Sequence, residues 1–200
     1  LNAVDETFSA SETLEIRIVV DGQKKGWSNF HDGLKDMPEV YDRPSGADKI
    51  ENNDTMLLYF TSGTTGEPKM VEHCFTYPLG HITTAKYWHR VIDGGLHYTL
   101  ADTGWAKAVW GKIYGQWLCG SAVFVSEFDT FTPTDVLLDI EKFGITTFCA
   151  PPTIYRFLIK DDLNKYDLST LKYCTVAGEP LSPVVFSKFK DSTGIELCEA

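Results

Sequence analysis

The stretch TPTDVLLDIEKFGITTFCAPP, residues 132–152, decides the fold class because a helix pattern runs directly into a strand pattern. Thr132 can cap a helix, Pro133 suits its first turn, and Gly144 suits its end. The residues ITTFCA (145–150) that follow are mostly β-branched, aromatic or apolar, which is typical of a strand buried in a parallel sheet. The stretch therefore predicts one helix–strand unit of an α/β protein.

Four more strand patterns share this spacing, so that five predicted strands begin 24, 24, 26 and 24 residues apart. The four lie at residues 97–101, 121–125, 171–177 and 195–199. Helix patterns occupy residues 104–120, 151–163 and 182–194. No sequence identity accompanies the spacing, so it indicates successive βα units rather than a repeat protein. The predicted fold class is α/β, with a largely parallel sheet and flanking helices.

The N-terminal part of the chain is less regular. Strands are predicted at LEIRIVV (14–20) and at LLYF (57–60), the second as a buried strand, while residues 24–54 are polar and irregular, as in a surface excursion. We therefore divide the chain into residues 1–55, with the first strand and this excursion, and residues 56–200, with the βα units.

Composition narrows the possible partners. The chain has 200 residues, of which 43% are hydrophobic and 23% charged, and this is typical of a globular protein. Its net charge is −10 and no basic cluster is present, which argues against nucleic acid or an anionic membrane as a partner. No apolar run approaches the ~18 residues of a membrane span. A phosphate ligand stays possible, because it needs only local donors.

Cysteine and histidine spacing favours neither disulfides nor a metal site. The five cysteines are odd in number and lie far apart in the chain, so we expect buried free thiols in a reducing cytoplasm. His73, His81, His89 and His97 recur every eight residues, whereas zinc pairs favour spacings such as i, i+4. We predict no metal site within the chain.

A loop rich in hydroxyls and glycines follows Phe60. Glycines let backbone N–H groups approach an anion, the hydroxyls can donate to phosphate oxygens, and Lys69 adds a positive charge. The loop is not a Walker A motif, because Pro68 precedes Lys69 and Met70 follows it. Composition alone leaves two interpretations open, a mobile surface turn and a cradle for an anion.

The string YFTSGTTGEPKMVEH (59–73) closely resembles the phosphate loop of the AMP-forming acyl-CoA synthetases, which belong to the adenylate-forming superfamily. The likeness continues, in order, through residues 101–125, 146–163 and 171–183, and it covers the chain from about residue 14. It is nearest to the medium-chain acyl-CoA synthetase branch, in which methionine also follows the lysine. The resemblance implies part of the large N-terminal domain of such an enzyme, with residues 56–200 as a nucleotide-binding part.

The resemblance also implies roles for particular residues. Lys69 would be catalytic, and the loop that binds the ATP phosphates would comprise Thr61, Ser62, Gly63, Thr64, Thr65, Gly66, Glu67, Pro68 and Lys69. Gly178, Glu179 and Pro180 would bind adenine; the alternative is a loop that leads into the next helix. Trp105 would line the acyl pocket; the alternative is a core tryptophan at a strand–helix junction.

The implied reaction joins a short- or medium-chain fatty acid to coenzyme A, with ATP as the energy source. The main ligand of Mg²⁺ would lie beyond Ala200, together with a C-terminal domain, so this chain would be a fragment that is inactive alone. Two alternatives stay open. One is another adenylate-forming enzyme, such as an aryl-CoA ligase or an adenylation domain, and the other is a non-catalytic nucleotide-binding module.

Overall fold

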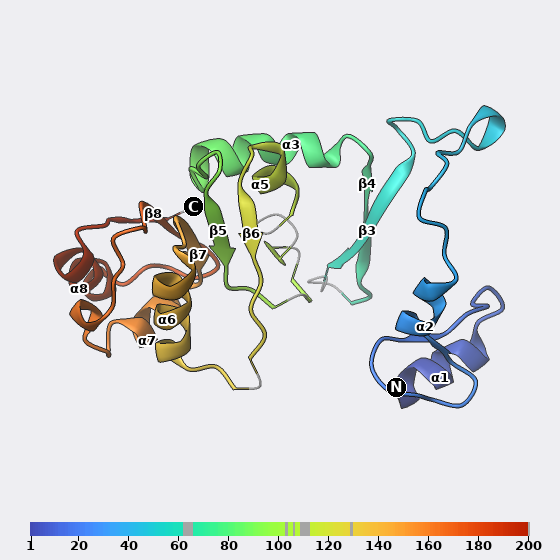
Figure 1. Ribbon diagram of the computed structural model, residues 1–200, viewed down its shortest axis with the longest axis horizontal. Coiled ribbons are helices and arrows are strands. Elements are labelled where there is room, and N and C mark those ends of the chain that lie inside the picture. Colours follow the sequence, from blue (N-terminus) through green and yellow to red (C-terminus); the bar gives the residue numbers. More distant parts are fainter. Residues whose placement is uncertain (62–65, 103, 106, 109–112, 129, 200) are drawn as a thin grey trace. The chain divides into compact units, whose positions relative to one another are not determined.

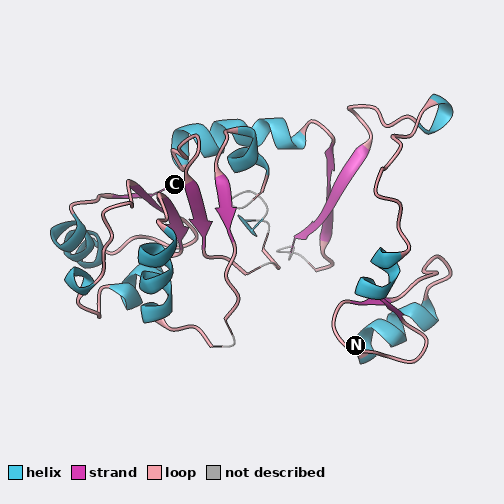
Figure 2. Cartoon of the chain, viewed as in Figure 1, coloured by secondary structure: helices cyan, strands magenta, loops and turns pink. Residues whose placement is uncertain are grey.

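The computed structural model describes residues 1–61, 66–102, 104, 105, 107, 108, 113–128 and 130–199 (Figures 1 and 2). The chain divides into two compact units, Leu1–Ile50 and Glu51–Ala200. The division of the chain between residues 55 and 56 stays a prediction. The two units are described separately below.

The first unit has short elements around one aspartate. They are helix α1 (Asn2–Ala10), strands β1 (Ile18–Val19) and β2 (Ser28–Asn29), helix α2 (Phe30–Lys35) and the 3₁₀ turn η1 (Gly46–Asp48). Asp5 pairs with Arg17 at 2.7 Å and accepts a hydrogen bond from the Trp27 indole at 2.9 Å. Hydrogen bonds to this carboxylate, the largest from Lys24, lower the pKa of Asp5 to about 2.

The structure of this unit differs from the sequence analysis in two places. The strand predicted at 14–20 is only two residues long, because Leu14, Ile16 and Ile18 are exposed and form no buried face. Helix α1 was not predicted, since it has no side-chain cap and buries no residue. The excursion at 24–54 contains the short elements β2, α2 and η1.

The second unit begins with a hairpin of strands β3 (Thr55–Thr61) and β4 (Lys69–Cys74). The two strands are antiparallel, and the register runs from Thr55 opposite Cys74 to Thr61 opposite Lys69. The predicted strand at 57–60 is confirmed, but it is not buried, since the exposed fraction is 49% for Leu58 and 69% for Phe60. Helix α3 (Tyr77–Thr83) and the π-helical turn η2 (Thr84–Trp88) follow.

A five-stranded sheet follows the hairpin in the sequence. Its strands are β5 (Leu96–Thr99), β6 (Ala122–Phe124), β7 (Thr147–Ala150), β8 (Tyr173–Val176) and β9 (Leu197–Glu199). All neighbours pair in parallel, in the order β6-β5-β7-β8-β9. The predicted α/β class and the five predicted strands are confirmed. From β5 the chain continues to β6 on one side, and the later strands β7, β8 and β9 follow on the other side of β5. The direction of the strand connections therefore reverses between β5 and β7.

The helices that connect these strands are α5 (Tyr114–Leu118), α6 (Pro133–Phe143), α7 (Pro152–Leu158) and α8 (Pro183–Thr193), with the 3₁₀ turn η3 (Leu163–Lys165) after α7. Helix α6 has the predicted ends. The Thr132 hydroxyl accepts a hydrogen bond from the Asp135 N–H at 3.2 Å, and Gly144 adopts φ 66°, a left-handed conformation that glycine favours. Helix α8 begins after Ser182 as predicted, but that side chain makes no capping bond.

The two faces of the sheet differ in chemistry. Helices α6, α7 and α8 pack on one face, which is apolar; Figure 1 shows α3 and α5 on the other side of the sheet. The central residues of the apolar core are Tyr98, Phe148, Cys174 and Val176 from the strands, and Val136, Leu137, Ile140, Tyr155, Leu158, Val185 and Phe189 from the helices. Because side chains alternate along a strand, the neighbouring residues point to the opposite face. They are His97, Thr99, Thr147, Cys149 and Thr175, all buried.

Helix α5 approaches α3 and η2 very closely. A Cβ atom at Gly115 would lie 2.3 Å from the His81 carbonyl oxygen and 2.7 Å from Ala85 Cβ. Only glycine fits at this contact. Helix α5 therefore covers the polar face of the sheet together with η2.

Two neighbouring leucines of α6 allow a direct test of this packing. Leu137 has 1% of its surface exposed and Leu138 has 47%. Leu137→Ala should lower the free energy of unfolding by about 2–5 kcal/mol, because it leaves a cavity in the core. Leu138→Ala, the matched control, should cost less than about 1 kcal/mol. Urea denaturation measures both, and equal losses would contradict this assignment of the core.

Candidate active site

A crevice opens at the carboxyl edge of the sheet, where the direction of the strand connections reverses. Its volume is about 1060 Å³. The lining comprises Tyr98 and residues 100–102, 105 and 107 from β5 onward, 125–128 and 131 after β6, 151 and 154 after β7, and 177–179 after β8. In open α/β sheets this is the usual position of a ligand site.

Three of the residues predicted from the sequence line this crevice. They are Trp105, Gly178 and Glu179. Trp105 has 72% of its surface exposed, so it is not a core tryptophan. Gly178 adopts φ 108° with no atom within 4 Å of a Cβ position, and its backbone is therefore open to a ligand. Pro180 follows directly in the chain but is not among the lining residues.

Glu179 connects two of the loops that form the crevice. It accepts a hydrogen bond of 2.6 Å from the Thr153 hydroxyl and lies 3.7 Å from the Arg156 guanidinium, and both partners belong to α7. The Leu181 N–H donates to the Glu199 carboxylate at 3.1 Å, which fixes the end of the same loop against β9. The backbone around Gly178 is thus held from two sides.

Sequence reasoning missed Lys107. Its ammonium lines the crevice and donates a hydrogen bond of 3.3 Å to the Ala177 carbonyl oxygen. The two residues are 70 positions apart in the sequence. A lysine in a predicted helix pattern usually lies on the solvated face, so the residue type gave no signal. The one sequence feature that could have indicated a site role for Lys107 is its position two residues after Trp105, a predicted site residue.

The predicted phosphate loop lies at the tip of the β3–β4 hairpin. Thr61 and Lys69 face each other at the ends of the two strands, and the Thr61 hydroxyl lies 3.5 Å from the Lys69 carbonyl oxygen. Gly66 adopts φ 130°, and Glu67 and Pro68 lead into β4. Ser62, Gly63, Thr64 and Thr65 lie outside the described residues. None of the described hairpin residues is among those that line the crevice.

A cluster of rings attaches the hairpin to the helices behind it. Tyr77 of α3 lies at its centre, with ring centroids 4.2 Å from His73, 4.5 Å from His81 and 5.9 Å from Tyr114. The Tyr59 ring of β3 lies 5.6 Å from His73. Desolvation raises the pKa of Tyr77 well above its usual range, so its hydroxyl stays protonated. The cluster orients the hairpin whose tip carries Thr61 and Lys69.

A layer of hydrogen-bonded polar groups lies on the second face of the sheet. The His97 ring contacts the Thr147 hydroxyl at 2.7 Å and the Thr99 hydroxyl at 2.8 Å, one through each nitrogen. His89 stacks on His97 with ring centroids 4.8 Å apart, and its Nδ1 accepts a bond of 3.0 Å from the Gln116 amide. Burial lowers the pKa of His89 to about 3, with a contribution from the Lys107 charge.

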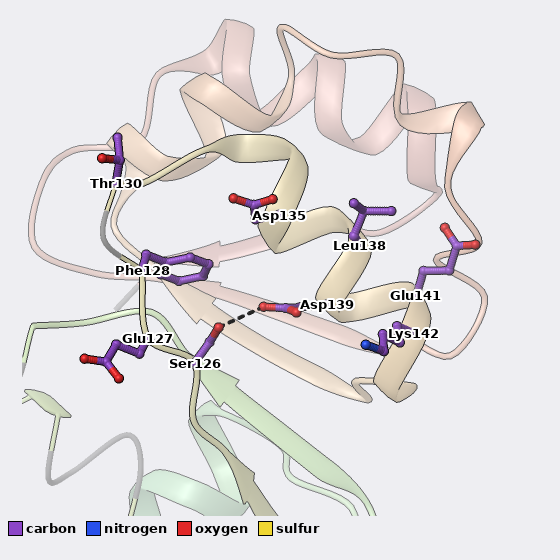
Figure 3. A pocket seen from close by; sticks show the side chains of 9 residues that line it. All are labelled: Ser126, Glu127, Phe128, Thr130, Asp135, Leu138, Asp139, Glu141 and Lys142. Carbon is purple, nitrogen blue, oxygen red and sulfur yellow. Dashed lines mark hydrogen bonds between the residues drawn. The ribbon is translucent and has the colours of Figure 1, made fainter.

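A second depression lies beside α6 (Figure 3). It shares Ser126, Glu127 and Phe128 with the crevice, and the Ser126 hydroxyl donates to Asp139 at 3.0 Å. Figure 3 shows Asp135 and Glu141 on the same helix. Among the residues described, no three histidine, cysteine or acidic side chains gather as metal ligands. Within the same part of the chain, no helix has the length and apolar character needed to span a bilayer.

Known proteins match this chain closely. The family described as "AMP-binding enzyme" matches residues 1–200. The mitochondrial acyl-coenzyme A synthetase ACSM3 of Homo sapiens is 34% identical over 199 residues, which are 98% of this chain and 33% of that protein. The chain thus spans about a third of the length of the curated relatives it matches.

Two solved structures share the fold. A crystal structure of the anthranilate CoA ligase AuaEII in complex with anthranoyl-AMP superimposes with a TM-score of 0.77 at 25% identity, covering 97% of this chain and 37% of that one. The acyl-CoA synthetase of Brucella canis gives a TM-score of 0.82 at 21% identity, covering 98% of this chain and 36% of that one.

The neutral His89 beneath the crevice makes stability depend on pH. Its folded pKa of about 3 lies below the unfolded value near 6.5, so between these values the unfolded chain binds the additional proton. The free energy of unfolding should therefore fall as pH falls from about 6.5 towards 3. Urea denaturation across this range should show a shallower slope for His89→Gln, by about one proton. Identical slopes in the two proteins would contradict a neutral His89.

Proposed function

Because this chain belongs to the AMP-binding enzyme family, we propose that the protein acts as an AMP-forming carboxylate–CoA ligase. A carboxylate oxygen attacks the α-phosphorus of ATP, which gives an acyl-adenylate and releases pyrophosphate. The thiol of coenzyme A then takes the acyl group, and AMP leaves. The names of the human relative, an acyl-coenzyme A synthetase, and of the anthranilate CoA ligase support this assignment.

The observation that carries the proposal is the shared crevice. Trp105, proposed as a wall of the acyl pocket, and Gly178 and Glu179, proposed to bind adenine, line one cavity at the edge of the sheet. An acyl-adenylate joins an acyl group to adenosine through one phosphate, so its two ends need adjacent sites in a single crevice. The proposed adenine segment also includes Pro180, the next residue in the loop.

The hairpin tip is proposed to bind the β- and γ-phosphates of ATP. Lys69 would stabilise the negative charge that builds up on pyrophosphate as it leaves, which is an electrostatic form of catalysis. No side chain needs to act as a general base, because carboxylic acids are already ionised at pH 7. Correct positioning and neutralisation of charge are then sufficient for the first step.

The substrates proposed for the whole protein are a carboxylic acid, ATP and coenzyme A. Mg²⁺ would accompany ATP, and its main ligand is proposed to lie beyond Ala200. Among the described residues, no three histidine, cysteine or acidic side chains gather as metal ligands. No step above is therefore assigned to the metal.

Short- and medium-chain fatty acids are the proposed acid substrates. The crevice wall supports an apolar substrate, since Leu100, Trp105, Phe128, Phe131 and Ile154 all line it. Aryl acids are a second candidate, because the structural neighbour at 25% identity is an anthranilate CoA ligase with bound anthranoyl-AMP. Both classes would use the same adenylation step.

A cytoplasmic location is also proposed. Free thiols at Cys74, Cys119, Cys149, Cys174 and Cys198 support a reducing compartment. The name of the human relative describes that protein as mitochondrial, and the mitochondrion is therefore the alternative. Imaging of the tagged full-length protein would decide between the two.

The proposed function is tested by carboxylate-dependent exchange between ATP and pyrophosphate in the full-length protein. Acids from acetate to decanoate, and benzoate as an aryl acid, should show exchange with one subset, because only bound acids form the adenylate. The 200-residue chain alone should show none. Absence of exchange with every acid, in a folded protein that binds ATP, would overturn the ligase proposal and favour a non-catalytic nucleotide-binding module.

Lys69 offers a test of the hairpin. Lys69→Ala should lower kcat for adenylation by about 10²–10³-fold, because the lost charge acts mainly on the leaving pyrophosphate. Initial rates of exchange measure the effect. Lys86→Ala is the matched control, since Lys86 is also exposed but belongs to η2. Equal rates for the wild-type protein and the Lys69 variant would exclude this role.

A further inference from the structure

Lys107 is one of the residues that line the crevice. Among the described residues that line this cavity, it alone carries a positive charge. Its ammonium donates to the carbonyl oxygen of Ala177, the residue before Gly178, and its backbone lies two positions after Trp105. The charge is therefore located between the proposed acyl wall and the proposed adenine segment, where a carboxylate and the α-phosphate of ATP would meet.

The ammonium has a donor to spare. Of its three N–H groups, the Ala177 carbonyl accepts one and the Cys149 side chain is a second partner, which leaves one for a ligand. Three carboxylates line the crevice, those of Asp102, Glu127 and Glu179. Asp102 accepts from the Gly104 N–H at 2.7 Å, and Glu179 contacts Thr153 and Arg156. Within the described part of the chain, none of the ion pairs involves Lys107.

The groups beneath Lys107 do not compensate its charge. Burial raises the pKa of the Cys149 thiol, so this group stays neutral although Lys107 opposes the shift. Burial also keeps His89 neutral, with a pKa of about 3. A half-buried cation without a counter-ion is unfavourable, and an anionic ligand in the crevice would recover that cost.

We propose that Lys107 binds an anionic oxygen of the ligand in the crevice. This inference rests on the proposed function and assigns the residue that recognises the charge at the reacting centre. The anionic oxygen belongs either to the carboxylate of the acid or to the α-phosphate of the nucleotide. Binding needs no proton transfer, because the ammonium donates its hydrogen bonds to a group that is already ionised.

Kinetics of the full-length protein distinguish the two sources. Lys107→Gln removes the charge but keeps a donor for the Ala177 carbonyl, and Lys107→Arg restores the charge. Lys172→Gln is the matched control, because the Lys172 ammonium also donates to a backbone carbonyl, that of Ser169 at 2.7 Å, but on the exposed surface.

If the carboxylate is the ligand, Lys107→Gln should raise the KM for the acid on the order of 10–100-fold with little change in the KM for ATP. If the α-phosphate is the ligand, the Kd for AMP and the KM for ATP should rise instead. Lys107→Arg should recover part of either loss, and Lys172→Gln should behave as the wild-type protein. Unchanged constants for both substrates in a folded Lys107→Gln protein would overturn the proposal.

A measurement on the unmodified protein needs neither a variant nor turnover. Lysines are labelled with an amine-reactive reagent, and mass spectrometry follows Lys107 and Lys172. AMP alone or the acid alone should protect Lys107, according to which ligand it binds, and should leave Lys172 reactive. No protection by either ligand, in a protein that catalyses exchange, would overturn the role of Lys107 and leave the ligase proposal intact. Protection without exchange would instead support the binding site and contradict the reaction.

Discussion

The parallel register of β5, β7 and β8 is the constraint on which the candidate site depends. Thr99 pairs with Cys149, and Cys149 pairs with Thr175, so the three strands end level with one another. The residues that follow each strand therefore meet at one edge of the sheet, although Lys107 and Ala177 are 70 positions apart in the chain. A slip of one residue in any of these strands would also exchange its apolar and polar faces.

The two faces of the sheet have different physical roles. The face under α6, α7 and α8 buries aromatic and aliphatic side chains, and this burial supplies most of the stabilisation. The other face buries polar groups, some of which bond to one another: His97 contacts both Thr99 and Thr147. Two buried groups on this face, His89 and Cys149, interact with Lys107 of the crevice.

Charge is distributed in a way that suits a small anionic ligand. The chain carries a net charge of −10, which favours neither nucleic acid nor an anionic membrane. The proposed recognition of phosphate and carboxylate would then depend on a few local donors, namely Lys69 at the hairpin tip, Lys107 in the crevice and the open backbone at Gly178. Such local sites bind anions without a basic surface.

The sequence by itself determined the α/β class and the five parallel strands. It also determined the ends of α6, because strand periodicity, the Thr132 cap and the Gly144 stop are local signals. The family resemblance pointed to Trp105, Gly178 and Glu179, which line the crevice, because the stretches that carry the resemblance are continuous. Local signals were insufficient for α1, which has no side-chain cap, and for the exposure of β3, which depends on its partner β4.

Only the tertiary structure decided which of these residues lie together. It placed Trp105 and Gly178 in one crevice, left the described hairpin residues out of the crevice lining, and brought Lys107 to the Ala177 carbonyl. The physical reason is that strand order and register are set by packing between distant segments. A lysine in a helix pattern has no sequence feature that distinguishes a solvated position from one that lines a ligand site.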